Sequence, residues 1–405
     1  MEKRHFFLVL ASFFLFACSS KSPDEPPNPD PGTGGGDNPA TEMKPNLASV
    51  RTFMVDKQAT AEAAALFYNL KTLSKTQYLI GQHENESVMS NATGGMTGEA
   101  IYSTDFMFIT DYLLDQGSYY VNQQTNIRNK IKAQYRKGEV ITMCWHYRDP
   151  IVGEQYSSTT GNFYWTNSGT GLADQNPAQQ KVVPRLIPGG SQHDRLKASL
   201  DIVANFANTL VDDNGKMIPV IFRPWHEQSG DWFWWGISHC NSPAEYIALW
   251  QFTVQYLRDT KGIHHFLYAY SPNGNTSNES TYLTSYGYPG DDYVDIFGVD
   301  YYLTNTVIAA TQGQLDLIVK LAKERNKIAA FTETGYDQSK YAKKDDVFTT
   351  LYAPLIYTRE IAYMAFWSGS NYIPSNTYTD FTTYVKTPRV VTSYNMPNMF
   401  VFPAN

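Results

Sequence analysis

The sequence predicts an α/β protein built as a (β/α)8 TIM barrel in a single large domain. Eight short apolar runs are typical of buried strands, and amphipathic stretches between them have the length that crossover helices need. Most of these runs end in polar or aromatic residues. The chain has 405 residues, 42% of them hydrophobic, which is enough for a large core. A doubly wound open sheet would also alternate in this way, but eight parallel strands with such ends favour closure.

The predicted strands share an apolar run bounded by polar or turn-forming residues. They cover 78–83, 106–110, 139–146, 217–225, 264–270, 294–300, 328–332 and 361–367. The amphipathic stretches that predict helices include 126–137, 194–211, 243–260 and 312–325. A long segment rich in Gly, Ser and Thr, at 150–190, predicts a loop that shapes a cleft.

The N-terminus has the pattern of an export signal. Lys3 and Arg4 precede an apolar run at 6–16 that is too short to span a bilayer. The run ends in Leu15-Phe16-Ala17-Cys18, which resembles a bacterial lipobox and implies cleavage before Cys18 and a lipid on its sulfur. We therefore expect a lipoprotein of a bacterial cell envelope, held at the membrane by its lipid alone. An ordinary secretory signal with a chance cysteine is the alternative.

Three segments follow from this interpretation. Residues 1–17 form the lipoprotein signal peptide, 18–45 form a disordered tether rich in Pro, Gly and Asp, and 46–405 form the barrel domain. Lipidation would leave only Cys144 and Cys240, too few for a disulfide framework, and the sequence does not say whether these two pair. Neither has the close Cys or His spacing of a zinc site, so we expect no metal.

The composition restricts the partners of this chain. Its formal charge is −7 and it has no basic block, which argues against a nucleic-acid partner. It contains 29 Tyr, 22 Phe and 8 Trp, more than a core requires, and such rings suit flat, half-polar ligands. Nothing in the sequence indicates a cofactor, and we expect a monomer.

Residues able to do chemistry gather at the predicted strand ends, which lie on one face of a barrel. They are His83, Glu84, Asp111, Tyr112, Trp145, His146, Arg148, Arg223, Trp225, His226, Glu227, Asp300, Tyr302, Glu333 and Trp367. Glu227 and Glu333 matter most, because two carboxyls brought together at such ends can break a glycosidic bond.

Two motifs around these glutamates identify a resemblance. The run Arg223-Pro-Trp-His-Glu-Gln-Ser-Gly-Asp-Trp-Phe-Trp-Trp-Gly236, followed by Phe331-Thr-Glu-Thr-Gly335, resembles glycoside hydrolase family 26, the retaining β-mannanases of clan A. The resemblance extends from about Leu47 to the C-terminus. It implies that Glu227 is the general acid/base and Glu333 the nucleophile. The other residues to which it implies a part in sugar binding are His146, His226, Trp232, Asp300, Tyr302 and Trp367.

The chemistry asks for these residue types independently of the resemblance. The nucleophile must stay ionised, which Tyr302 and a cation such as Arg223 would favour, while the acid must stay protonated, which the Trp-rich segment after Glu227 would favour by desolvation. A retaining reaction predicts carboxyl groups about 5 to 5.5 Å apart. The nearby Trp232, Trp234 and Trp235 cannot all face one cleft, and we expect Trp232 to do so.

The function that we predict is retaining hydrolysis of β-1,4-mannosidic bonds in mannan, galactomannan or glucomannan. The same fold could act on another β-glycan, a mixed-linkage β-glucan or a β-1,3-xylan. A noncatalytic glycan-binding lipoprotein is a third interpretation, although the presence of both glutamates argues against it. Endo or chain-end action and tolerance of galactose side chains are open at this point.

Overall fold

The computed structural model describes residues 42–404, except for 85–88, 90, 92–94, 96–97, 111–117, 151–162, 164–180, 275, 304–307, 337–345 and 368–379. The chain divides into two units, Met1–Glu42 and Met43–Asn405. Only Glu42 of the first unit is described. The predicted signal peptide, Cys18 and almost all of the predicted tether therefore lie outside the described residues.

Eight parallel strands close into a barrel. They are β1 (Tyr78–His83), β2 (Ile101–Asp105), β3 (Val140–Trp145), β4 (Val220–Pro224), β5 (Phe266–Tyr270), β6 (Ile296–Leu303), β7 (Ile328–Tyr336) and β8 (Tyr363–Phe366). Each strand pairs with the next, and β8 pairs back onto β1, with Leu79 opposite Tyr363. A short β9 (Val390–Val391) extends the sheet beside the start of β1. The prediction of a (β/α)8 barrel is confirmed.

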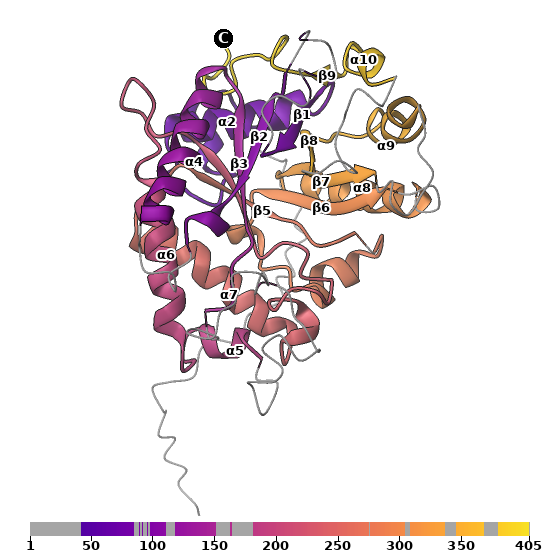
Figure 1. Cartoon of the computed structure of the whole chain (residues 1–405). Helices are drawn as coiled ribbons and strands as arrows, with labels where there is room; N and C mark the ends of the chain where they lie inside the picture. The colour runs from indigo at the N-terminus through magenta and orange to yellow at the C-terminus, as the bar shows by residue number, and fades with distance from the viewer. Residues whose placement is uncertain are drawn as a thin grey trace, which may run out of the picture. The chain divides into compact units, whose positions relative to one another are not determined.

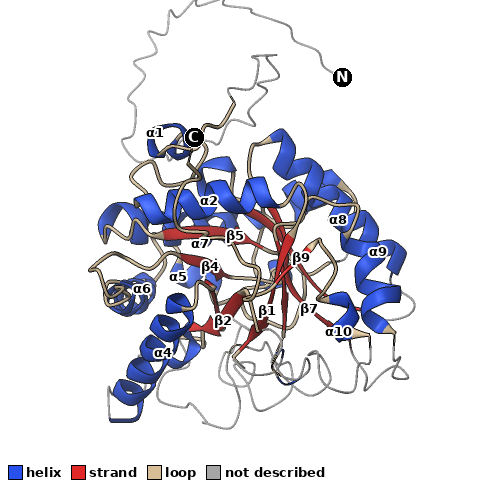
Figure 2. Cartoon of the chain, turned by 90° about the horizontal axis from the view of Figure 1, so that it is seen from above, coloured by secondary structure: helices blue, strands red, loops and turns tan. Residues whose placement is uncertain are grey.

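Helices surround the strands, as the view from above shows (Figure 2). The helices are α1 (Leu47–Arg51), α2 (Ala61–Leu73), α4 (Ser118–Arg136), α5 (Val183–Leu186), α6 (His193–Ala207), α7 (Pro243–Gln255), α8 (Ile308–Glu324), α9 (Ala353–Ile356) and α10 (Phe381–Tyr384). Single 3-10 turns lie at Phe106–Phe108, Ile237–His239 and Asp291–Tyr293, and π-helical turns at Tyr256–Thr260, Thr281–Ser285 and Phe348–Tyr352. The colours of Figure 1 run from the N-terminus to the C-terminus, so the alternation of strands and helices can be traced along the chain. Among the described residues, no helix combines the length and apolar character that crossing a membrane requires.

The strands are buried on both faces, as expected of a parallel sheet covered by helices. On the outer side of the sheet, against α6, the rings of Phe106 and Phe222 pack edge to face at 5.2 Å, Phe222 lies 5.3 Å from Phe266, and Phe106 lies 6.0 Å from Phe206 of α6. Gly81 permits the close approach of β1 to β2, because a Cβ there would lie 2.4 Å from the carbonyl oxygen of Ile101.

The prediction of the second strand is wrong. The strand is Ile101–Asp105, and the apolar residues Phe106–Phe108 that suggested it form a 3-10 turn. Asp105 begins this turn by accepting the backbone N–H of Met107 at 2.8 Å. The prediction followed the apolar residues because buried strands are usually apolar. Ser103, Thr104 and Asp105 are polar, but they too are buried.

This shift changes which residues end the second strand. The strand ends at Asp105, so Asp111 and Tyr112 are not its terminal residues, and both lie outside the described residues. The other seven strands overlap their predicted positions. β6 and β7 continue beyond the predicted ends, so that Asp300, Tyr302 and Glu333 lie within strands.

The register between β6 and β7 brings two carboxyl groups of the site together. Asp300 lies directly opposite Glu333 on the neighbouring strand, and the pairing shifts register between Val299 and Asp300. Because of this pairing, a single side chain from another strand can reach both carboxyl groups.

Candidate active site

A strained turn directly after β4 carries Glu227. Trp225 and Glu227 both have left-handed backbone conformations, with φ of 49° and 56°. Such conformations cost about 1–3 kcal/mol each for residues other than glycine and persist only where the surroundings hold them. Here the hydroxyl of Tyr246 donates to the carbonyl of Trp225 at 2.8 Å, and the backbone N–H of Glu227 donates to the carbonyl of Ser271 at 2.8 Å. The turn therefore fixes the position of Glu227.

The carboxyl group of Glu227 lies in an environment that favours its protonated form. Burial raises its pKa well above the ordinary value, and the charges of Glu333 and Asp300 raise it further. A hydrogen bond of 2.7 Å from Nε1 of Trp232 to Oε2 acts in the opposite direction. The side chain can therefore hold a proton in the pH range where an ordinary glutamate has lost it.

Glu333 lies in the opposite kind of environment. Nη2 of Arg223 donates to its Oε2 at 2.6 Å, and the hydroxyl of Tyr302 donates to its Oε1. Donors on both oxygens stabilise the ionised carboxylate and fix its orientation. Each glutamate is buried, and within the described part of the chain a cation pairs with Glu333 but not with Glu227.

Arg223 joins two carboxyl groups in the interior. Its guanidinium is 3% exposed and also donates to Oδ2 of Asp300. Asp300 further accepts hydrogen bonds from Ser271 at 2.9 Å and from Thr332 at 2.7 Å. Burial raises the pKa of Asp300 to about 7, although the Arg223 cation acts against this rise and the charge of Glu333 adds to it. Burial alone would lower the pKa of Arg223, but its two carboxyl partners raise it well above the ordinary value.

Two imidazoles lie beside the glutamates. Nε2 of His226 is 3.2 Å from Nε2 of His146, and Nδ1 of His146 is 2.6 Å from Oδ2 of Asp105. Burial lowers the pKa of His226 well below its ordinary value, and the charge of Arg223 lowers it further. His226 is therefore a neutral imidazole at physiological pH.

Aromatic rings complete the site. Trp367, directly after β8, stacks on His83 with the ring centroids 3.9 Å apart and lies 5.5 Å from the ring of His146. Its backbone is held by Gln82, whose Nε2 donates to the Trp367 carbonyl at 2.8 Å. Trp367 and Trp232 are both partly exposed and can offer a ring face or edge to a ligand.

The neighbours of Trp232 in the motif are core residues. Trp234 and Trp235 are fully buried, and their indole N–H groups donate to the carbonyls of Tyr147 and His226 at 2.7 and 2.8 Å. Their rings pack edge to face with the centroids 5.3 Å apart, and of the three tryptophans it is Trp232 that donates to Glu227, as expected.

Comparisons with known proteins agree with this geometry. Residues 55–375 match the family described as Glycosyl hydrolase family 26. The chain belongs to this family. It is 32% identical over 343 residues to a mannan endo-1,4-beta-mannosidase of Bifidobacterium adolescentis, covering 78% of this chain and 32% of that protein. It is 33% identical over 259 residues to a mannan endo-1,4-beta-mannosidase of Bacillus subtilis, covering 62% of this chain and 61% of that protein.

This chain is also similar to proteins of solved structure. The structure of GH26C from Muricauda sp. MAR_2010_75 has a TM-score of 0.79 and 34% sequence identity to this chain, covering 90% of this chain and all of the other. The chain thus spans a full structural domain of that kind, whereas it spans only 32% and 61% of the two curated relatives.

The predicted site residues of this family 26 chain fall into three contact groups. One joins Arg223, Asp300, Tyr302 and Glu333, another joins Glu227 and Trp232, and the last joins His146, His226 and Trp367. Trp145 and Trp225, also predicted at strand ends, are core residues whose N–H groups bond to Thr110 and Thr253.

Sequence reasoning missed Asp105, Ser271 and Thr332 as members of the site. Ser271 directly follows β5, the one strand for which no terminal residue was singled out. Asp105 ends β2 and was hidden by the misplaced strand. A search for polar residues after every apolar run would have found Ser271, whereas Asp105 precedes the apolar run at 106–110 and would still have been missed.

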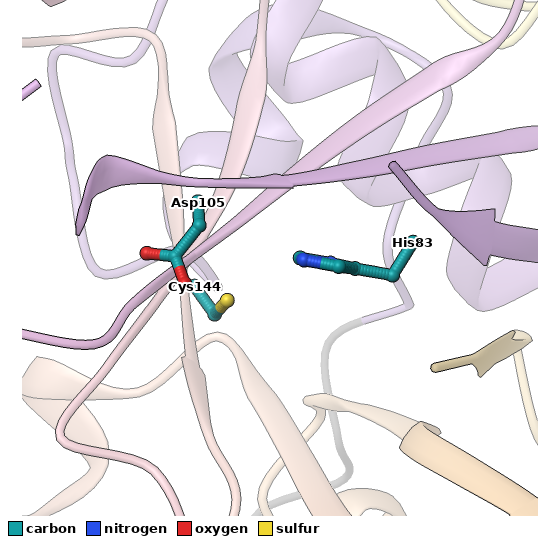
Figure 3. A group of neighbouring side chains, drawn as sticks. All are labelled: His83, Asp105 and Cys144. Carbon is teal, nitrogen blue, oxygen red and sulfur yellow. The ribbon is translucent and has the colours of Figure 1, made fainter. Parts of the chain in front are cut away.

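Three side chains of types that bind metals lie close together beside His146 in this family 26 chain. The ligand atoms of His83, Asp105 and Cys144 are within 4.8 Å of one another, and the ring of His83 points toward the other two (Figure 3). The donor types would suit Zn²⁺. However, both oxygens of Asp105 already accept hydrogen bonds, and burial followed by the charge of Asp105 raises the pKa of Cys144, which keeps it a thiol. The arrangement favours a hydrogen-bonded network over a bound ion.

The structure also answers the open question about cysteine pairing. Cys144 and Cys240 are both buried free thiols. They form no disulfide with one another.

Replacing Trp232 with Phe should raise the pKa of Glu227 further. The change keeps a ring but removes the N–H that stabilises the charged carboxylate. The pKa should rise because the charged form loses a donor while burial and the neighbouring carboxylates continue to favour the protonated form. A ¹³C NMR titration of the Glu227 carboxyl group measures it.

Trp250→Phe is the matched control for this titration. Trp250 also donates through Nε1, but to the carbonyl of Tyr293 in another part of the barrel. The control should leave the Glu227 titration unchanged. A pKa that stays the same or falls in Trp232→Phe would contradict our account of Glu227.

Proposed function

We propose that this protein hydrolyses β-1,4-mannosidic bonds in mannan, galactomannan or glucomannan with retention of the anomeric configuration. The observation that carries this proposal is the contrast between two buried glutamates. Glu333 is paired with Arg223 and Tyr302, and Glu227 has no cationic partner among the described residues. Membership of glycosyl hydrolase family 26 supports a glycosidase, and the names of the similar proteins support mannan as the substrate.

In the first step, an oxygen of Glu333 attacks the anomeric carbon and forms an ester with it. The bond from that carbon to the glycosidic oxygen breaks, and Glu227 gives its proton to the leaving oxygen. Arg223 and Tyr302 hold the attacking carboxylate in position, so that little reorganisation is needed when the bond forms.

In the second step, Glu227 is a carboxylate and takes a proton from water. The water oxygen attacks the anomeric carbon, the ester bond breaks, and Glu333 returns to its ionised form while Glu227 regains its proton. The N–H of Trp232 stabilises Glu227 during its charged interval. Two inversions give net retention, for which the two carboxyl groups should lie about 5–5.5 Å apart.

The remaining site residues suit the reacting sugar. The apolar face of a pyranose can stack on Trp367 or Trp232, while hydroxyl groups require polar partners. We assign one such partner to His146, while His226 and Asp300, which are fully buried, support His146 and Arg223.

Substrate class is tested by reducing-sugar release from galactomannan, lichenan and β-1,3-xylan in parallel. We expect release from galactomannan to exceed that from the other two polymers by at least tenfold. Release from lichenan or xylan without release from the mannan would favour another β-glycanase. Binding to the mannan without release from any polymer would favour a noncatalytic glycan-binding protein.

The same preparation can show where the chain is cut. With mannohexaose and an unsubstituted mannan, a mixture of products at early times indicates internal cleavage. Mannobiose alone from the first time point indicates chain-end action.

Variants of the two glutamates test the mechanism. Glu333→Ala should abolish turnover, and Glu227→Ala should lower it by about 10²–10⁴, the range of a general acid/base contribution. An aryl mannoside whose leaving group departs without a proton allows a rescue test. Azide should restore turnover of this substrate in Glu227→Ala, and the product should be the β-mannosyl azide, identified by ¹H NMR. Glu279→Gln, which alters an exposed ion pair with Lys320, is the control and should keep full turnover. Unchanged turnover in Glu333→Ala, or an α-configured azide, would reject the mechanism.

The N-terminal sequence supports lipid attachment at Cys18 and a location at the bacterial cell envelope. The full chain, expressed in a bacterium fed an alkyne-tagged palmitate, should carry the label and sediment with membranes. Cys18→Ala should lose the label and become soluble, and light scattering should then show a monomer. Label that persists in Cys18→Ala would exclude this attachment site.

A further inference from the structure

Asp105 is a buried carboxylate that the sequence did not single out. It is 2% exposed and is held at the end of β2, opposite Cys144 of β3. Its Oδ1 accepts the backbone N–H groups of Met107 at 2.8 Å and of His146 at 3.1 Å. Its Oδ2 faces Nδ1 of His146 at 2.6 Å. One oxygen thus anchors the carboxylate to the backbone, and the other is directed at an imidazole.

The contact with Asp105 determines which nitrogen of His146 carries hydrogen. An ionised carboxylate only accepts hydrogen bonds, so Nδ1 of His146 must be the donor. The two backbone N–H groups on Oδ1 and the N–H of His146 on Oδ2 stabilise the ionised carboxylate, although burial acts against it. In a neutral His146, Nε2 is then an acceptor.

The same logic extends to His226. Only one hydrogen can lie between the two Nε2 atoms, which are 3.2 Å apart. If Nε2 of His146 is an acceptor, Nε2 of His226 must be the donor, and Nδ1 of His226 carries no hydrogen. Within the described part of the chain that buried Nδ1 has no hydrogen-bond partner. This arrangement leaves no N–H of either ring without an acceptor, whereas the reverse one would bury an unpaired Nδ1–H of His226.

We propose that Asp105 is a positioning residue that sets the tautomer of His146 and, through it, that of His226. The N–H of His226 is then directed at Nε2 of His146, and Asp105 fixes the orientation of both rings. This inference rests on the proposed function for its kinetic consequence. Its structural part, the tautomers themselves, does not depend on any substrate.

Asp105→Asn tests the inference with little change in shape. The Asn oxygen can keep the two backbone N–H bonds, which places the NH₂ group against Nδ1 of His146. Nδ1 must then accept, so its hydrogen moves to Nε2, and His226 must change to the Nδ1–H form. In ¹⁵N NMR of protein labelled at histidine, we expect Nδ1–H for His146 and Nε2–H for His226 in the wild type, and the reverse in the variant. His146→Gln and His226→Gln assign the signals.

Activity provides the second measurement. We expect kcat/KM on mannohexaose to fall by about 10–100-fold in Asp105→Asn, the range seen when a carboxylate that orients a histidine is lost. Most of the fall should be in kcat, because contacts to the reacting sugar strengthen in the transition state. Asp105→Glu, which keeps an acceptor, should retain the wild-type tautomers.

Asp295→Asn is the matched control. Asp295 is also fully buried, but its carboxylate accepts the backbone N–H groups of Val55 and Tyr268, at 2.8 and 3.0 Å, in place of an imidazole. This variant should lower the melting temperature without changing either tautomer or kcat/KM.

Several outcomes would overturn the inference. They are an Nε2–H tautomer of His146 in the wild type, unchanged tautomers and kcat/KM in folded Asp105→Asn, and tautomer changes of the same kind in Asp295→Asn. If Asp105→Asn does not fold, the wild-type tautomers still decide the matter. If no mannan is hydrolysed at all, the proposed function fails while the NMR test remains valid.

Discussion

The site depends above all on one buried cation, the guanidinium of Arg223. The side chain extends from β4 and donates to Asp300 on β6 and to Glu333 on β7. It is almost completely removed from solvent. Removing charges from water costs several kcal/mol per ion, and this cost is offset only while partners remain in contact. Loss of one partner would leave an uncompensated buried charge. The three side chains are therefore stable as a unit, and this unit holds Glu333 in one orientation.

Glu227 lies in the same electrostatic field but outside this unit. No cation contacts its carboxyl group among the described residues, so burial and the neighbouring carboxylates favour its protonated form. The difference between the two glutamates therefore arises from where one guanidinium is directed. A double displacement needs this difference, because one carboxyl group must attack as an anion while the other supplies a proton.

These polar groups reduce the stability that the barrel would otherwise have. Two left-handed residues, Trp225 and Glu227, lie in one short turn, and several charged side chains occupy space that apolar residues could fill. The cost is offset by aromatic packing beneath the turn, where Trp225 contacts Trp234 and Trp235. Ser271 and Thr332 donate hydrogen bonds to Asp300, and Asp105 accepts one from His146, which keeps these side chains in one arrangement.

The barrel and the two glutamates could be predicted from the amino-acid sequence, because burial of each strand and the motifs around Glu227 and Glu333 are local properties of the chain. Tertiary structure alone decided that β2 ends at Asp105, that Cys144 and Cys240 stay unpaired, and which partners each carboxyl group has. Arg223 and Glu333 are 110 residues apart, and Asp105 and His146 are 41 apart. The register between strands sets such contacts, and periodicity within one segment reports only whether that segment is buried.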